Sequence, residues 1–224
     1  MDPNKIDTRT VKVIFEVKGL LRFLSHQETA RMFKRAIARS GVRLHYSQGF
    51  NPHPKMSLPL PRSVSMASEC ELLQLSIVAD EFGKFPTADQ VRSLLEPQMP
   101  EDIEIANVEI YEDKVKFNPA DVTYSIPVRQ EENIKKKITD IKEQLDSGSS
   151  LILERVSHKT GKSKCVDLAD FIEKMEISDK DVTVVARILN GTSVKLEELT
   201  KMFGIEESDL NGPIVRENVE WNIK

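Results

Sequence analysis

Two apolar periodicities alternate along the chain, and their order limits what its 224 residues can fold into. Period-two patterns, which are typical of half-buried strands, are separated by stretches with helical spacing. In the first half, strands are predicted at residues 11–17, 42–46, 56–60, 71–78 and 103–111, and helices at residues 25–40 and 87–95. A strand, a helix, strands, a helix and a strand in this order indicate a ferredoxin-like βαββαβ unit.

The second half of the chain repeats this plan. Strands are predicted at residues 122–128, 151–156, 171–177, 182–189 and 214–221, and helices at residues 131–145 and after Ser193, with a basic turn at residues 157–164. A chain of this length accommodates two domains of about 100 residues each. We therefore expect an α+β fold made of two tandem ferredoxin-like (βαββαβ) units with antiparallel sheets. The units are expected to cover residues 1–115 and 116–224, with a polar linker at residues 113–119.

The first helix has clear start and stop signals. Ser25 and Glu28 have the spacing of a capping box, and Gly41 follows the last residue with helical periodicity. The buried face is predicted to carry Ala30, Phe33, Ala36 and Ile37. The remaining surface of the helix carries Arg31, Lys34, Arg35 and Arg39. The exposed side of this helix should therefore be strongly positive. Thr87 and Gln90 predict a second capping box.

Charge is distributed unevenly along the chain. Residues 1–64 hold 12 Lys and Arg against 4 Asp and Glu, a net charge of +8, whereas residues 65–224 carry −12. A basic face raises the local concentration of polyanions such as RNA, or of an acidic partner protein. The alternative is that the two oppositely charged halves attract each other.

The segment from Tyr46 to Lys55, of sequence YSQGFNPHPK, is the least regular part of the chain. Its glycine and two prolines predict a loop with restricted conformational freedom. Its aromatic, amide and basic side chains suit stacking on bases and hydrogen bonding to base edges. The alternative is a structural loop whose aromatic rings pack inward. The candidate binding residues are Arg22, His26, Arg31, Lys34, Arg35, Arg39, Tyr46, Gln48, Phe50, Asn51, His53 and Lys55.

No catalytic signature stands out in the sequence. A P-loop, a dinucleotide-binding glycine pattern and a Cys-x-x-Cys pair are all missing. His26 and His53 are the candidate acid/base groups of an RNA-acting enzyme. The spacing of His26, His45 and His53 with Cys70 or Glu71 matches no metal-ligand pattern. We therefore expect no metal, no cofactor and a non-catalytic role.

Two further expectations concern the protein's environment. Cys70 and Cys165 are far apart in the sequence and are expected to be core residues in a reducing compartment. No apolar run approaches the roughly 18 residues that a membrane span requires. The first residues also lack the apolar stretch of a secretory signal. We therefore expect a cytoplasmic location and no membrane partner.

Several short motifs follow one another in a distinctive order. They are Phe23-Leu-Ser-His26, Arg31-x-Phe-x-Arg-Ala36, Tyr46–Lys55, Leu58-Pro-Leu-Pro61 and Ser68-Glu-Cys-Glu71, followed by a weaker element at residues 161–167. This order resembles the bacterial radical-SAM-linked protein family, strongly over residues 22–71 and weakly beyond. The resemblance implies an uncharacterised domain, free-standing or joined to a radical-SAM, cobalamin-type protein, that helps a radical enzyme acting on RNA.

These observations together predict a radical-SAM-linked accessory protein that binds tRNA or rRNA, or presents it to a radical-SAM partner enzyme. One alternative is an adaptor that docks on such an enzyme without touching RNA. The other is an RNA-processing or RNA-modifying enzyme that uses His26 or His53.

Overall fold

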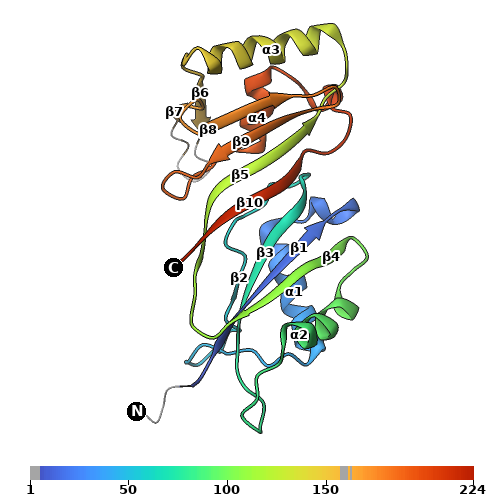
Figure 1. Ribbon diagram of the computed structural model, residues 1–224, viewed down its shortest axis with the longest axis vertical. Helices are drawn as coiled ribbons and strands as arrows, with labels where there is room; N and C mark the ends of the chain where they lie inside the picture. The colour runs from blue at the N-terminus through green and yellow to red at the C-terminus, as the bar shows by residue number, and fades with distance from the viewer. Residues whose placement is uncertain (1–5, 157–160, 162) are drawn as a thin grey trace. The chain divides into compact units, whose positions relative to one another are not determined.

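A computed structural model of the protein describes residues 6–156, 161 and 163–224. The chain forms two compact units (Figure 1). Unit 1 ends at Pro119 and also includes Trp221–Lys224, and unit 2 covers Ala120–Glu220. The C-terminal residues join unit 1 because Lys116 and Lys224 exchange two backbone hydrogen bonds, of 2.9 and 3.0 Å. Both units combine helices with strands, which confirms the α+β class.

Unit 1 is built on an antiparallel sheet whose strand order is β4-β1-β3-β2. Its elements are β1 (Arg9–Val17), η1 (Gly19–Phe23), α1 (His26–Ser40), β2 (Met56–Ser57), β3 (Ala67–Ile77), α2 (Ala88–Leu95), η2 (Glu96–Gln98) and β4 (Ile103–Tyr111). Alternation along β1 turns Val11, Val13 and Phe15 to one face, where all three are fully buried. The two helices cover that face of the sheet.

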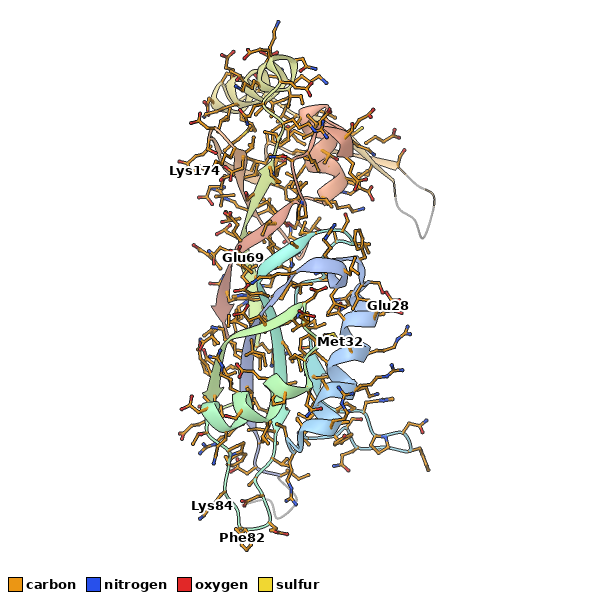
Figure 2. The ribbon with its side chains drawn as sticks, turned by 90° about the vertical axis from the view of Figure 1, so that its right-hand side faces the viewer. Glu28, Met32, Glu69, Phe82, Lys84 and Lys174 are labelled. Carbon is orange, nitrogen blue, oxygen red and sulfur yellow. The ribbon has the colours of Figure 1, made fainter. Side chains whose placement is uncertain are left out.

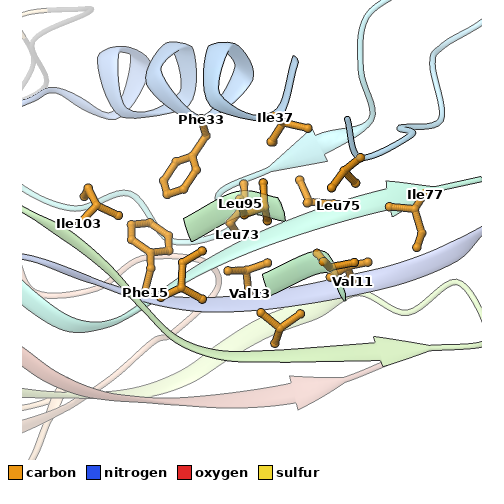
Figure 3. Packing of buried hydrophobic residues seen from close by; sticks show 14 of the residues in the cluster. Val11, Val13, Phe15, Phe33, Ile37, Leu73, Leu75, Ile77, Leu95 and Ile103 are labelled. Carbon is orange, nitrogen blue, oxygen red and sulfur yellow. The ribbon is translucent and has the colours of Figure 1, made fainter. Parts of the chain in front are cut away.

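The core of unit 1 lies between this face and the helices (Figure 3). The rings of Phe15 and Phe33 meet edge to face, with their centroids 4.6 Å apart. Ile37 from α1, Leu73 and Leu75 from β3 fill the space beside them. Removing one such aromatic side chain costs about 3–5 kcal/mol, so this packing fixes how α1 lies on the sheet.

The predicted helix signals of unit 1 are confirmed. Ser25 Oγ accepts from Glu28 N at 3.3 Å, and Glu28 Oε2 accepts from Ser25 N at 2.8 Å. Gly41 ends α1 with a φ of 81°, a left-handed conformation that glycine adopts without steric cost. Thr87 and Gln90 form the same reciprocal pair at the start of α2. Of the predicted buried face, Ala30 is only half-buried.

Two predicted strands of unit 1 are wrong in extent. Residues 42–46 form isolated bridges, from Leu44 to Ile77 and from Tyr46 to Pro54, rather than a strand. The predicted strand at residues 56–60 shrinks to Met56–Ser57. Leu44 and β2 both pair with β3, and the segment at residues 46–55 lies between them in the chain.

Unit 2 has strand order β10-β5-β9-β8, with a separate β6-β7 hairpin. Its elements are β5 (Phe117–Pro127), α3 (Glu132–Asp146), β6 (Ile152–Val156), β7 (Ser163–Asp167), β8 (Ile172–Ile177), β9 (Asp181–Arg187), α4 (Leu196–Phe203), η3 (Glu207–Asp209) and β10 (Val215–Ile223). Residues 157–160 and 162, within the predicted basic turn, lie outside the described residues.

Three predictions about local structure are wrong. The linker at residues 113–119 already contains the start of β5, where the buried ring of Phe117 packs on Tyr111 at 5.5 Å. The N-cap of α4 is Lys195 rather than Ser193. Cys165 is exposed and Cys70 half-buried, so neither is a true core residue, and the two do not form a disulfide.

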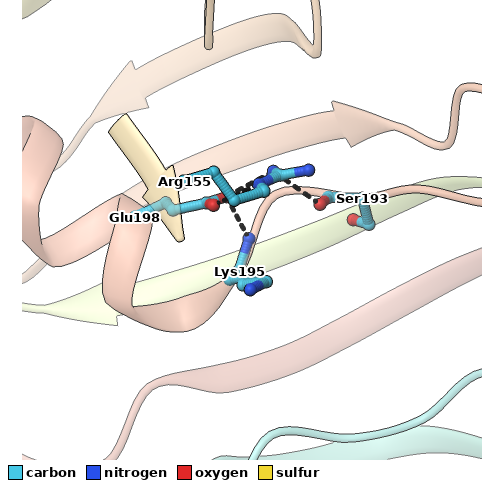
Figure 4. A network of polar contacts seen from close by, with 4 residues as sticks. All are labelled: Arg155, Ser193, Lys195 and Glu198. Atoms are coloured by element: carbon cyan, nitrogen blue, oxygen red, sulfur yellow. Dashed lines mark hydrogen bonds and ion pairs between the residues drawn. The ribbon is translucent and has the colours of Figure 1, made fainter. Parts of the chain in front are cut away.

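A buried ion pair accounts for the start of α4 (Figure 4). Arg155 of β6 donates through Nε and Nη2 to the two carboxylate oxygens of Glu198, at 2.6 and 2.7 Å. The same carboxylate accepts from Lys195 N at 2.9 Å. Burial raises the pKa of Glu198, but the Arg155 hydrogen bond and the Lys195 amide outweigh it and hold that pKa below its usual value. This pair joins β6 to the first turn of α4.

Candidate functional site

Three cations form an exposed ridge on α1. Arg31, Lys34 and Arg35 are spaced three and four residues apart, so they lie on one side of the helix and are all exposed. Within the described part of the chain, none of the three side chains makes a hydrogen bond or ion pair. In Figure 2, side chains with terminal nitrogens extend outward from α1. We call these three residues the α1 ridge, and its charge is open to an external anion.

Two of the predicted binding cations have partners within the protein. Arg39 Nε donates to Gln98 Oε1 at 3.0 Å, and Arg39 Nη2 donates to the Gln98 carbonyl at 3.2 Å. Arg22 donates to the Gly19 carbonyl at 2.8 Å, and its guanidinium lies 4.4 Å from the Phe23 ring centroid. A phosphate would have to compete with these contacts, so both residues are weaker candidates than the α1 ridge.

The Tyr46–Lys55 segment, which we call the 46–55 loop, leaves the sheet edge and returns to the same place. His45 N donates to the Ser76 carbonyl at 2.8 Å, and Ser76 N donates to the Lys55 carbonyl at 2.9 Å. Lys55 N in turn donates to the His45 carbonyl at 2.8 Å. Both ends of the loop are therefore held against one residue of β3.

A second set of bonds closes the loop just beyond its base. Ser47 N donates to the His53 carbonyl at 2.8 Å, and His53 N donates to Ser47 Oγ at 2.9 Å. Gly49 has a φ of 136°, a conformation that residues with a Cβ rarely adopt. The backbone bonds hold the stem of the loop, while the part beyond it contacts little of the protein.

The side chains of the loop point to solvent. Phe50 at its tip is fully exposed, at 107% of the reference area, and Tyr46 at its base is 47% exposed. The other predicted binding residues of the loop, Gln48, Asn51, His53 and Lys55, are also exposed. The alternative in which Phe50 packs inward is therefore wrong. A bare aromatic ring on a hydrogen-bonded stem is suited to stacking on another planar group.

His45 is buried beneath the stem of the loop. Its side chain is only 9% exposed, and in the described chain its Nδ1 has no hydrogen-bond partner. Burial lowers the pKa of His45, and the positive charges of Lys55 and Lys114 lower it further. This histidine therefore remains neutral at neutral pH and supports the loop rather than contacting a ligand.

His26 lies apart from the loop. As the first residue of α1, it lines a small pocket with Thr29, Arg62 and Glu71, and no residue of the 46–55 loop borders that pocket. The pocket has a volume of about 10 Å³, about that of a single water molecule. The structure thus does not bring His26 and His53 into one site.

Sequence reasoning overlooked Arg62. Its side chain is buried and donates to the carbonyls of Arg22, at 2.7 Å, of Leu21, at 3.2 Å, of Leu24, at 3.3 Å, and of Met66. Arg62 therefore holds η1 against the loop that precedes β3. The available signal was a lone arginine directly after the Leu58-Pro-Leu-Pro61 motif.

The α1 ridge and the 46–55 loop belong to the same unit and adjoin in sequence. Only Gly41–His45 separates the end of α1 from the loop, and five residues span at most about 17 Å when extended. Figure 2 shows the loop projecting beside the C-terminal end of α1, on the opposite end of the helix from Glu28. Positive charge and exposed aromatic rings therefore occur together in unit 1.

Comparison with known proteins places the chain in a family. The model of the family described as "Uncharacterized protein conserved in bacteria (DUF2344)" matches residues 10–199. The chain belongs to the DUF2344 family. The match includes the α1 ridge, the 46–55 loop and the Arg155–Glu198 pair. No curated protein matches this DUF2344 chain.

One similar solved structure is the ligand-free regulatory subunit of aspartate kinase from Thermus thermophilus. It shares 12% sequence identity, and the match covers 82% of this chain and 84% of that one. The TM-score of 0.27 is too low for this likeness to support any conclusion about fold or function.

In the described residues, no group of three or more His, Cys, Asp and Glu side chains could hold a metal ion. Among the helices that the structure describes, none has the length and apolar character needed to cross a lipid bilayer.

Proposed function

We propose that this DUF2344 protein is an RNA-binding accessory protein that uses the 46–55 loop and the α1 ridge as one surface. The observation that carries this proposal is the fully exposed Phe50 ring on a hydrogen-bonded stem, in the same unit as three exposed cations that make no hydrogen bond or ion pair within the described residues. Aromatic rings stack on unpaired bases of any sequence, and cations hold the phosphates between them.

The proposal includes tRNA or rRNA as the ligand and a radical-SAM enzyme as the protein to which the RNA is presented. The resemblance that suggests this partner is strongest over residues 22–71, and both parts of the proposed surface fall in that range.

We also propose that each unit is ferredoxin-like. The strand orders β4-β1-β3-β2 and β10-β5-β9-β8 support this, because in each the first and third strands of a βαββαβ order are neighbours and the second and fourth lie on either side of that pair.

The salt dependence of RNA binding tests the role of the α1 ridge. Each phosphate contact to single-stranded RNA contributes about 0.7 to the slope of log K against log salt. The variant Arg31→Ala/Lys34→Ala/Arg35→Ala should therefore lower the magnitude of this slope by about 2. Fluorescence anisotropy with a labelled single-stranded RNA, titrated at several salt concentrations, measures it.

A matched control separates this surface from charge in general. The variant Lys135→Ala/Lys136→Ala/Lys180→Ala removes the same charge from exposed positions of unit 2, and its slope should equal that of the wild type. RNA binding that is flat between low and physiological salt would refute the proposal. Cleavage or modification of RNA by the pure protein, lost in His53→Ala, would instead support the enzymatic alternative.

One observation favours a second candidate, an adaptor that docks on a protein partner. Leu20 is 77% exposed, Phe23 47% and Val64 51%. Val64 is held beside η1 because Ser65 N donates to the Arg22 carbonyl at 3.0 Å. Exposed apolar side chains that gather on one surface often mark protein interfaces.

The adaptor candidate makes its own prediction. A radical-SAM enzyme should co-purify with the protein under anaerobic conditions after nuclease treatment, and Leu20→Asp should abolish this association. Co-purification that is lost with nuclease would show that RNA bridges the two proteins. An association that Leu20→Asp leaves intact would remove this patch from the interface.

A further inference from the structure

A second site lies in unit 1, close in sequence to the 46–55 loop, and it is not part of the surface formed by that loop and the α1 ridge. It is a pocket of about 570 Å³ bordered by Gly41–Arg43, by the turn that contains Asp80 and Lys84, and by α2. Small-molecule sites commonly have volumes of about 300–1,000 Å³. The pocket is therefore large enough for a ligand of nucleotide size.

The charge of this pocket favours an anion. Arg43 and Lys84 line it, and in the described chain neither side chain makes a hydrogen bond or ion pair. The one acidic lining residue, Asp80, uses Oδ1 to accept from Phe82 N at 2.9 Å and from Lys84 N at 2.8 Å. That carboxylate is committed to shaping the turn, so the two cations remain available to a ligand.

The remaining walls suit a planar ring with polar edges. Phe85, Pro86 and Leu94 provide apolar surface, and Leu94 is 42% exposed. Gln90 Oε1 accepts from Thr87 N at 2.8 Å, whereas its amide nitrogen has no partner among the residues that the structure describes. Apolar walls, one amide donor and two cations match a base with an attached phosphate.

No residue of the 46–55 loop lines the pocket, but the two are close along the chain. Arg43 precedes Tyr46 by three residues of extended chain, which span about 10 Å. Stacked nucleotides advance by about 3.4 Å along one strand, so roughly three of them cover this distance. Figure 2 places Phe82 and Lys84 at the same end of unit 1 as the loop. One RNA strand can therefore reach both places.

We propose that this pocket takes a single nucleoside monophosphate unit, in which Arg43 and Lys84 meet the phosphate and the Phe85–Leu94 side meets the base. This inference rests on the proposed function, because the nucleotide in the pocket is one residue of the RNA that the 46–55 loop holds. A free nucleotide has the same chemistry, and the experiment below distinguishes the two sources.

The test uses AMP, UMP and inorganic phosphate as probes of the full-length protein. NMR titration should show AMP or UMP binding with a Kd that is roughly millimolar or tighter, and the amide shifts should be confined to residues 41–43 and 80–94. The variant Arg43→Glu/Lys84→Glu should weaken this binding at least tenfold. Both residues are exposed, so the variant should keep its fold. The control Lys135→Glu/Lys136→Glu has the same charge change in unit 2 and should bind like the wild type.

The outcomes separate the pocket from the RNA surface. RNA binding without any AMP or UMP binding overturns the pocket and leaves the proposed function standing. Nucleotide binding by a protein that does not bind RNA supports the pocket and assigns it to a free nucleotide, while the proposed function fails. Inorganic phosphate that binds as tightly as AMP, or shifts that lie outside the pocket, overturns the nucleotide assignment.

Discussion

Replacing Phe50 with alanine should separate the proposed RNA binding from folding. Phe50 is 107% exposed, so its truncation removes no buried contact and should change the free energy of unfolding by less than about 0.5 kcal/mol. The comparison is Phe15→Ala, where the side chain is fully buried and touches Phe33, and the cost should be about 3–5 kcal/mol.

The same truncation should weaken RNA binding substantially. A base stacked on an aromatic side chain contributes about 1–3 kcal/mol. Because 1.4 kcal/mol corresponds to a factor of ten, the loss of one stack should raise the Kd by about 5- to 150-fold. This weakening should not depend on salt, since a phenyl ring contacts no phosphate.

Two assays on the same samples show whether Phe50 stacks on RNA or packs against the protein. Fluorescence anisotropy with a single-stranded RNA gives the Kd, and urea denaturation gives the free energy of unfolding. Leu189→Ala, at an exposed apolar position of unit 2, controls for the loss of surface area. A Phe50→Ala protein with normal stability and unchanged affinity would refute stacking at this position. A large loss of stability would show that the ring packs against the protein.

Three further predictions concern the scaffold. Gly19→Ala should lower the free energy of unfolding by about 1–3 kcal/mol in thermal denaturation, because its φ is 48° and the added Cβ would lie 2.2 Å from Asp102 Oδ1. Folding lowers the pKa of His45 from 6.5, so the unfolded state binds more protons than the folded state below about pH 6.5. The free energy of unfolding should therefore decline as the pH falls toward the pKa of His45 in the folded state. In urea titrations at several pH values, His45→Leu should flatten this dependence on pH. Arg155→Met should lower the free energy of unfolding by about 3–5 kcal/mol, because the Glu198 carboxylate stays buried without its partner. In chemical denaturation, the double variant Arg155→Met/Glu198→Leu should regain most of this loss.

Each scaffold prediction has an outcome that contradicts it. Gly83→Ala also has a positive φ, of 76°, but its Cβ would meet open space, so it measures backbone strain alone. Equal losses at Gly19 and Gly83 would exclude the clash with Asp102. A pH slope that survives in His45→Leu would assign the titration to another group. A double variant as unstable as Arg155→Met would show that the cost does not come from the lone carboxylate.

Local signals made much of unit 1 predictable. The capping boxes at the starts of α1 and α2 each depend on two side chains three residues apart, so the sequence alone defines them. The alternation in β1 and β4 is equally local, because one buried face imposes a period of two. The exposed cations of α1 follow from the same helical geometry.

Non-local contacts explain what the sequence did not reveal. Arg62 reads as a surface cation, but it is buried because distant carbonyls around η1 accept its hydrogen bonds. Ser193 has good capping chemistry, yet Lys195 is the N-cap of α4 because Glu198 is held by Arg155. The strand predicted at residues 42–46 is broken because the chain turns away from β3 at the loop. None of these partners is adjacent in sequence.

The attachment of the 46–55 loop at both ends to Ser76 has a consequence for how such proteins can diverge. Because the loop leaves and rejoins the sheet at Ser76, it does not affect the pairing register of the strands. The length and sequence of the loop can therefore change while the core packing stays the same. Natural variants can therefore exchange the ten residues of this loop without disturbing the sheet. An engineer can use the same two anchor points to graft a foreign recognition sequence onto this scaffold.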